Sequence, residues 1–235
     1  MYKVIVFDVG DTLIEYVPDQ ITVVTDRFAD IGIEIGRETA LEVSRITELS
    51  VAEQILREIN GAERMDDDAF MAYINDRIMA IPTVSEQLKS DALKDAFIAG
   101  MKRVKQKKTV KKNVHRILQM LKEKYRLGII SNYSAELSDY LKECGLYSYF
   151  DAVVISAEVG YEKPDPRIYK YFLEKMSCDA ADCLYVGDHP FDVMGAKRAG
   201  MGMVWLNNIY DNMPEFIKEK PDYTIRTIDK LTEIL

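Results

Sequence analysis

The sequence YKVIVFDVGDTLI, residues 2–14, opens with an apolar run and continues into a polar loop. Residues 2–7 are rich in β-branched and aromatic side chains and lack the alternation of a half-exposed strand. They therefore predict a fully buried strand. Asp8 follows this strand directly, and Gly10 separates it from Asp11. The stretch thus predicts a central strand that carries a carboxylate to the edge of a sheet.

Helical patterns alternate with short apolar strands from residue 113 onward. Strands are predicted at 126–132, 150–156, 183–188, 201–206 and 222–225, with helices between them and a terminal helix at 227–235. This alternation is typical of a parallel sheet with helices on both faces. The expected fold is α/β, with a Rossmann-like parallel-sheet core.

Residues 15–108 follow a different pattern, because apolar positions recur at helical spacing throughout. Helices are predicted at 18–32, 36–61, 66–81 and 85–104, with no convincing strand among them. We therefore expect an all-helical domain, residues 15–108, inserted into a core of residues 1–14 and 109–235. The basic stretch KRVKQKKTVKK, residues 102–112, is interpreted as a solvated helix end that runs into a linker.

The composition excludes some classes of function. The chain has 235 residues, and 31 Lys and Arg against 39 Asp and Glu give a net charge of −8, which argues against a nucleic-acid-binding surface. No run approaches about 18 apolar residues, so no membrane-spanning helix is expected. The cysteines Cys144, Cys178 and Cys183 form no CxxC pair and are interpreted as free thiols in a reducing cytoplasm.

Polar residues lie at the ends of several predicted strands. In open α/β sheets, ligands bind beyond the carboxyl ends of the strands, so these residues should gather at one edge. The expected set is Asp8, Ser131, Asn132, Lys163, Asp188 and Asp192. Alone, an aspartate or the Ser-Asn pair would be interpreted as turn or cap residues and Lys163 as a surface lysine, and their convergence changes that interpretation. Carboxylates this close need a counter-charge, which Mg²⁺ with oxygen ligands supplies.

The order of these residues resembles the haloacid dehalogenase superfamily over essentially the whole chain. The matching positions are an aspartate after a strand with a threonine four residues on, a serine at a strand end, a lysine before a proline, and a GDxxxD motif. In this sequence they are Asp8 with Thr12, Ser131, Lys163, and Asp188 with Asp192. The inserted helical segment resembles the C1-type cap of that family. Its placement suggests the subgroup of phosphoglycolate phosphatase-like enzymes and the haloacid dehalogenases.

The resemblance implies a metal-assisted reaction at Asp8. This carboxylate would attack phosphorus to form an aspartyl-phosphate that water then hydrolyses. Mg²⁺ would be held by the side chains of Asp8 and Asp188 and by the backbone carbonyl of Gly10. Asp192 would act through metal-bound waters, which it would orient.

The same resemblance implies a small phosphorylated substrate. Ser131 and Lys163 would hold the phosphoryl oxygens, and Lys163 would offset the charge that develops on them. Thr12 and Asn132 would position the loop after the first strand and the substrate. Neither a nucleic acid nor a membrane is expected as a partner.

Gly10 stands where most phosphatases of that family carry a second aspartate, which protonates the leaving alkoxide and then activates the hydrolytic water. Loss of such a group typically costs ~10²–10⁴-fold in rate. Asp11 is one position further along, and a shift of one residue points a side chain elsewhere. We therefore do not count Asp11 as a replacement for the missing acid. A cap residue or the substrate could supply the acid instead.

Three functions follow, and the first is favoured. It is a Mg²⁺-dependent phosphatase that is slow or limited to good leaving groups. The second is a 2-haloacid dehalogenase, in which Asp8 attacks carbon and the halide needs no proton, although such enzymes generally lack the GDxxxD motif. The third is a non-catalytic regulatory protein that keeps the phosphate and metal sites.

Overall fold

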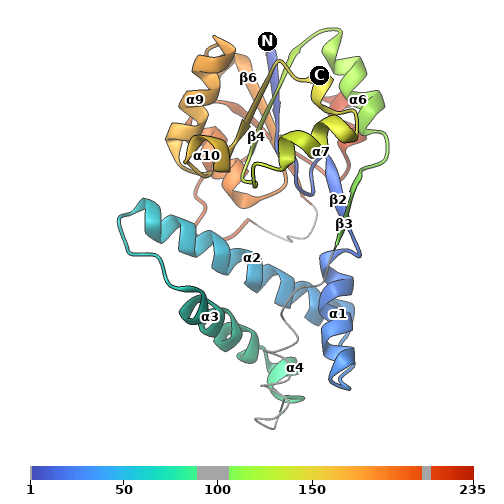
Figure 1. The fold of residues 1–235 in the computed structure, drawn as a ribbon, viewed down its shortest axis with the longest axis vertical. Coiled ribbons are helices and arrows are strands. Elements are labelled where there is room, and N and C mark those ends of the chain that lie inside the picture. The colour runs from blue at the N-terminus through green and yellow to red at the C-terminus, as the bar shows by residue number, and fades with distance from the viewer. Residues whose placement is uncertain (1, 89–105, 208–212) are drawn as a thin grey trace. The chain divides into compact units, whose positions relative to one another are not determined.

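A computed structural model describes residues 2–88, 106–207 and 213–235 of the chain (Figure 1). The chain divides into two compact units, one formed by Met1–Glu15 with Thr109–Leu235 and the other by Tyr16–Lys108. Among the described residues, no helix combines the length and the apolar character needed to cross a membrane.

The first unit is built on a six-stranded sheet in the order β5-β4-β1-β6-β7-β8. Every neighbouring pair in it is parallel. The strands are β1 Val4–Phe7, β4 Arg126–Ser131, β5 Ala152–Ile155, β6 Cys183–Gly187, β7 Gly202–Leu206 and β8 Tyr223–Ile225. All residues of β1, β5, β6 and β7 are buried, as expected for strands covered on both faces. The predicted Rossmann-like core is confirmed.

Helices cover both faces of this sheet, with α9 and α10 on one side and α6 on the other (Figure 1). The helices of this unit are α6 Val114–Lys122, α7 Leu137–Glu143, α8 Ser156–Val159, α9 Pro166–Met176 and α10 Pro190–Arg198. Short 3₁₀ turns add η1 Tyr147–Tyr149, η2 Ala180–Asp182 and η3 Ile228–Glu233. The prediction of an ordinary helix at the C-terminus is wrong, because η3 is a 3₁₀ segment. It buries Ile228 and Leu231, whose separation matches the three residues per turn of that helix.

The second unit contains α1 Gln20–Asp30, α2 Arg37–Ile59, α3 Asp67–Met79 and α4 Pro82–Ser85. The helices share an apolar core that includes Phe28, Val43 and Ile78. Asp19 and Asp66 accept hydrogen bonds from backbone N–H groups at the starts of α1 and α3, as N-cap residues do. These helices agree with the first three predicted in the insertion. The fourth, predicted at 85–104, lies mostly outside the described residues.

Two strands were not expected at the junction of the units. β2 Ile14–Val17 pairs with β3 Lys107–Val110 in a two-stranded sheet, and the backbone N–H of Lys111 donates to Leu13 O at 3.0 Å. The interpretation of residues 102–112 as a helix end and linker is therefore wrong for the part that forms β3. The partner strands lie about ninety residues apart in the sequence, so no local turn announces their pairing.

Candidate active site

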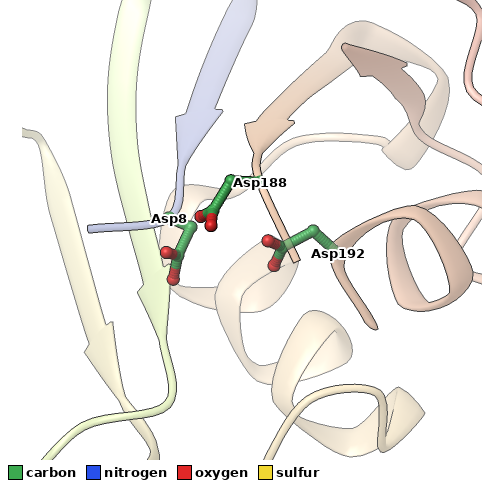
Figure 2. A group of neighbouring side chains, drawn as sticks. All are labelled: Asp8, Asp188 and Asp192. Atoms are coloured by element: carbon green, nitrogen blue, oxygen red, sulfur yellow. The ribbon is translucent and has the colours of Figure 1, made fainter. Parts of the chain in front are cut away.

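Three adjacent strands deliver the central side chains of the site. β1 lies between β4 and β6 in the sheet. Asp8 follows the end of β1, Ser131 is the last residue of β4, and Asp188 follows the end of β6. Asp192 projects from the first turn of α10, and its carboxylate points toward those of Asp8 and Asp188 (Figure 2). The parallel strands thus bring residues from distant parts of the chain to one edge of the sheet.

Lys163 lies at the centre of this group and is 4% exposed. Its Nζ atom donates to Asp8 Oδ1 at 2.6 Å and to Asp192 Oδ1 at 2.6 Å. Ser131 Oγ donates to the same oxygen of Asp8 at 3.0 Å. Because these groups are buried, charge-assisted hydrogen bonds of this length fix their relative positions strongly.

The hydroxyl of Tyr185, on β6, completes the surroundings of Lys163. It lies 2.8 Å from Ile130 O, 3.1 Å from Asp192 Oδ1 and 3.3 Å from Lys163 Nζ. Tyr185 is not among the site residues predicted from the sequence. The available signal was a tyrosine inside an otherwise apolar strand, three positions before Asp188, where a buried hydroxyl requires a partner.

Two further contacts fix Asp188. Thr12 Oγ1 donates to Asp188 Oδ1 at 2.8 Å, which ties the loop after β1 to the end of β6. Trp205 Nε1, from β7, donates to the backbone carbonyl of Asp188 at 2.8 Å, so this aromatic side chain also supports the site. The Thr12 side chain is completely buried. Its hydroxyl is therefore shielded from water and donates its hydrogen bond to Asp188.

Asn132 is bound to the backbone of Lys163 at both ends of its amide. Its Nδ2 donates to Lys163 O at 3.0 Å, and Lys163 N donates to its Oδ1 at 2.6 Å. This reciprocal pair holds the loop that carries the lysine. Gly10 is half-buried and forms an isolated bridge with Ile14. Asp11 is exposed and has a left-handed backbone with φ of 48°.

His189 begins α10 and acts as its N-cap. Its Nδ1 accepts a hydrogen bond from Phe191 N at 3.1 Å, and its own backbone N–H donates to Asp192 Oδ2 at 3.0 Å. This capping box holds the carboxylate oxygen of Asp192 that Lys163 does not contact. Burial, and next the charge of Lys163, lower the pKa of His189 to about 4, so the ring is neutral at physiological pH.

Burial dominates the electrostatics of the carboxylates. It raises the pKa of Asp8, which Lys163 partly offsets. Burial, followed by the charges of Asp8, Asp192 and Asp11, raises the pKa of Asp188 well above its ordinary value. Burial alone would lower the pKa of Lys163, but Asp192 and Asp8 raise it overall. One ammonium thus faces several carboxylates, and the site favours a further positive charge.

The donor set fits a hard divalent cation. Asp8, Asp188 and Asp192 each offer a carboxylate oxygen, and these atoms lie within 4.8 Å of one another (Figure 2). Oxygen ligands of this kind suit Mg²⁺, which binds to one or two carboxylates and retains several waters. The residues present are therefore compatible with the expected ion.

Known proteins similar to this chain are phosphatases and dehalogenases. A segment of 122 residues is 36% identical to pyrimidine 5'-nucleotidase YjjG of Escherichia coli, covering 51% of this chain and 53% of that protein. The chain spans about half the length of that relative and of several other curated relatives that it matches. Phosphoglycolate phosphatase of Vibrio vulnificus is 25% identical over 239 residues, covering 99% of this chain and 96% of that protein.

The fold is also found in the solved structure of L-2-haloacid dehalogenase from Xanthobacter autotrophicus. The two align with a TM-score of 0.59 and 20% identity, covering 100% of this chain and 98% of that one. The family described as haloacid dehalogenase-like hydrolase matches residues 5–206, a range that includes every site residue named above. The chain therefore belongs to the haloacid dehalogenase-like hydrolase family.

Proposed function

We propose that this protein is a Mg²⁺-dependent phosphatase that acts on a small phosphorylated metabolite through an aspartyl-phosphate on Asp8. The observation that carries the proposal is the placement of Asp8, whose carboxylate lies beside Lys163 and Ser131 and within 4.8 Å of other carboxylates. A nucleophile, an ammonium group and a candidate cation site thus share one buried edge of the sheet. The named phosphatases among the relatives support the same reaction.

In the first step Asp8 attacks phosphorus, and the bond from phosphorus to the leaving oxygen breaks. The lysine ammonium and the serine hydroxyl are placed to receive the phosphoryl oxygens, where they would offset negative charge in the transition state. When bound, Mg²⁺ would be held by Asp8, Asp188 and the backbone carbonyl of Gly10 and would neutralise phosphoryl charge. Asp192 would orient the waters around it.

In the second step water attacks the phosphorus of the aspartyl-phosphate, and the carboxylate of Asp8 is released with inorganic phosphate. Thr12 and Asn132 position Asp188 and Lys163 through the contacts described above, and we propose that they order the phosphate site by this route. We further propose that residues 15–108 select the substrate for the core formed by residues 1–14 and 109–235. The protein is proposed to work in the cytoplasm.

The arrangement favours the phosphatase over the dehalogenase. Displacement of a halide from carbon uses one carboxylate and has no use for the cluster that adds Asp188 and Asp192 to Asp8. Phosphoryl transfer does use such a cluster, because a cation held there neutralises charge on the phosphoryl group.

The test compares wild type with Asp8→Asn, which keeps the size of the side chain and removes the nucleophile. With Mg²⁺, wild type should hydrolyse 4-nitrophenyl phosphate, and the variant should show only background release. Circular dichroism of both proteins checks that the variant is folded. Equal turnover by the two proteins would contradict the role of Asp8. Chloride release from 2-chloropropionate without added metal would favour the dehalogenase, and tight phosphate binding without turnover would favour the regulatory protein.

A further inference from the structure

We propose that Tyr185 is a positioning residue of this site, whose hydroxyl holds the ammonium of Lys163 and the carboxylate of Asp192 against the sheet. The kinetic part of this proposal rests on the proposed phosphatase function. Its structural part concerns the contacts of one buried hydroxyl and can be tested by metal binding alone.

The ammonium of Lys163 has as many polar neighbours as it has N–H donors. A lysine ammonium has three N–H donors and no acceptor. In this structure Nζ has three polar neighbours, namely Asp8, Asp192 and the hydroxyl of Tyr185. The tyrosine is therefore the partner that satisfies the third donor of a buried charge. An unsatisfied donor on a buried charged group is costly, so this contact constrains where the ammonium lies.

The hydroxyl of Tyr185 has a single proton to donate, and its oxygen can also accept. Lys163 donates to its oxygen, and the hydroxyl itself can donate to Ile130 O at 2.8 Å or to Asp192 Oδ1 at 3.1 Å. The phenol oxygen thus joins the backbone of β4, a residue of α10 and the loop that carries Lys163. These three parts of the chain must keep their spacing for Asp8 and Asp192 to share the same ammonium.

Lys163 Nζ contacts Asp8 in this structure, and it would have to turn toward phosphoryl oxygens when Asp8 attacks phosphorus. A lysine side chain is long and flexible. Contacts with Tyr185 and Asp192 would keep the ammonium in place during this change, because neither of those groups reacts.

A purely structural role for Tyr185 is the competing explanation, and Tyr169 provides the matched control. Both rings are completely buried, and their centroids lie 6.0 Å apart. The Tyr169 hydroxyl lies 3.4 Å from the backbone carbonyl of Phe191. No hydrogen bond from it to a carboxylate or an ammonium is found within the described part of the chain. Removing either hydroxyl deletes the same atom from the same core, and only Tyr185→Phe removes a contact with Lys163 and Asp192.

The experiment compares Tyr185→Phe with Tyr169→Phe in the full chain. For Tyr185→Phe we expect kcat on 4-nitrophenyl phosphate to fall about tenfold with KM nearly unchanged, because the lost contact orients a group that acts in the transition state. We also expect Mg²⁺ binding, measured by calorimetry, to weaken several-fold because Asp192 is less fixed. Tyr169→Phe should match wild type within about twofold in both measurements.

Equal kcat and equal Mg²⁺ affinity in the two variants would overturn the proposal. If wild type proves inactive, the proposed function fails, but the calorimetric comparison still decides the role of Tyr185. Thermal melts report folding in parallel. If Tyr185→Phe does not stay folded at the assay temperature, wild type and both variants are compared at a lower temperature at which the thermal melts show all three folded.

Discussion

At the scale of single residues, we propose that Gly10 limits which substrates the site can use. Its backbone carbonyl can still face a cation, since any residue supplies that group. It has no side chain to protonate a leaving alkoxide or to activate water. Five glycines among the described residues have a positive φ, and Gly10 is not one of them. An aspartate could therefore adopt its backbone conformation without strain of that kind.

We predict that wild type hydrolyses aryl or acyl phosphates much faster than alkyl phosphates. Gly10→Asp should raise kcat/KM on alkyl phosphates by about tenfold or more and change kcat/KM on aryl phosphates little, because kcat/KM reports the transfer to Asp8 and only alkoxide departure needs the acid. Steady-state kinetics on 4-nitrophenyl phosphate and glycerol phosphate measure both rates. Gly10→Asn, which offers no carboxylic acid, is the matched control.

Equal kcat/KM values of wild type on aryl and alkyl esters would mean that another group supplies the proton. Asp11 would then be the first residue to examine, because its charge acts on Asp188. In that case Asp11→Asn should lower alkyl turnover selectively.

Residue positions at strand ends were the part of the site that sequence could predict. Asp8, Ser131 and Asp188 follow from strand boundaries and parallel topology alone. The sequence shows that the buried polar atoms of Tyr185 and Trp205 need partners, but it does not show whether each partner is a backbone carbonyl or a functional group. Their roles depend on three-dimensional neighbours far away in the sequence.

At the scale of elements, the start of α10 links stability to the site, because the N-cap residue His189 also holds Asp192. We predict that His189→Ala lowers the free energy of unfolding by about 1 kcal/mol at neutral pH, since a backbone N–H at the helix start loses its acceptor. His189→Asn keeps an acceptor and should lose clearly less. Urea denaturation of the three proteins measures the difference.

The pH dependence of that difference has a definite sign. The pKa of His189 is lowered from 6.5 to about 4, so the fold favours the neutral ring. The contribution of His189 to the free energy of unfolding is complete above pH 6.5 and is lost as pH falls through about 4. The gap between wild type and His189→Ala should therefore narrow on acidification. A gap that stays constant over this range would contradict the assignment.

Element prediction failed where pairing is non-local. β1, β5, β6 and β7 of the large sheet are short runs of mainly apolar residues that are buried throughout, so their burial is visible in the sequence. β2 and β3 are short, Ile14 is the one buried residue in the two strands, and the whole insertion separates them in the sequence. Their formation is decided by tertiary structure, which overrides a weak local pattern.

At the scale of the whole molecule, the carboxylate cluster makes stability depend on pH and on cations. The raised pKa values of Asp8 and Asp188 mean that the folded protein holds these protons more tightly than the unfolded chain. The stabilisation that these two protonated groups contribute is complete below the ordinary carboxyl pKa of 3.8 and is lost as pH rises through their raised pKa values. Without a cation, ionisation of the cluster therefore lowers the free energy of unfolding.

We predict that Mg²⁺ raises the melting temperature more at alkaline than at acidic pH, because it binds the ionised carboxylates. Asp188→Asn keeps an acceptor for Thr12 and should lose most of the shift. Thermal melts with and without Mg²⁺, from acidic to alkaline pH, measure the shift in melting temperature. A shift that is independent of pH, or one that the variant retains in full, would count against the cluster as the metal site.

The central claim is that Asp8 carries the phosphoryl group, and acid quenching during turnover tests it most directly. Because Gly10 offers no base to activate the hydrolytic water, the second step should be slow and the aspartyl-phosphate should accumulate. Mass spectrometry of peptides from quenched 4-nitrophenyl phosphate reactions should find one added phosphoryl group on the peptide that contains Asp8, and none in Asp8→Asn. Steady phosphate release with that peptide unmodified, or with the group on another residue, would contradict the account.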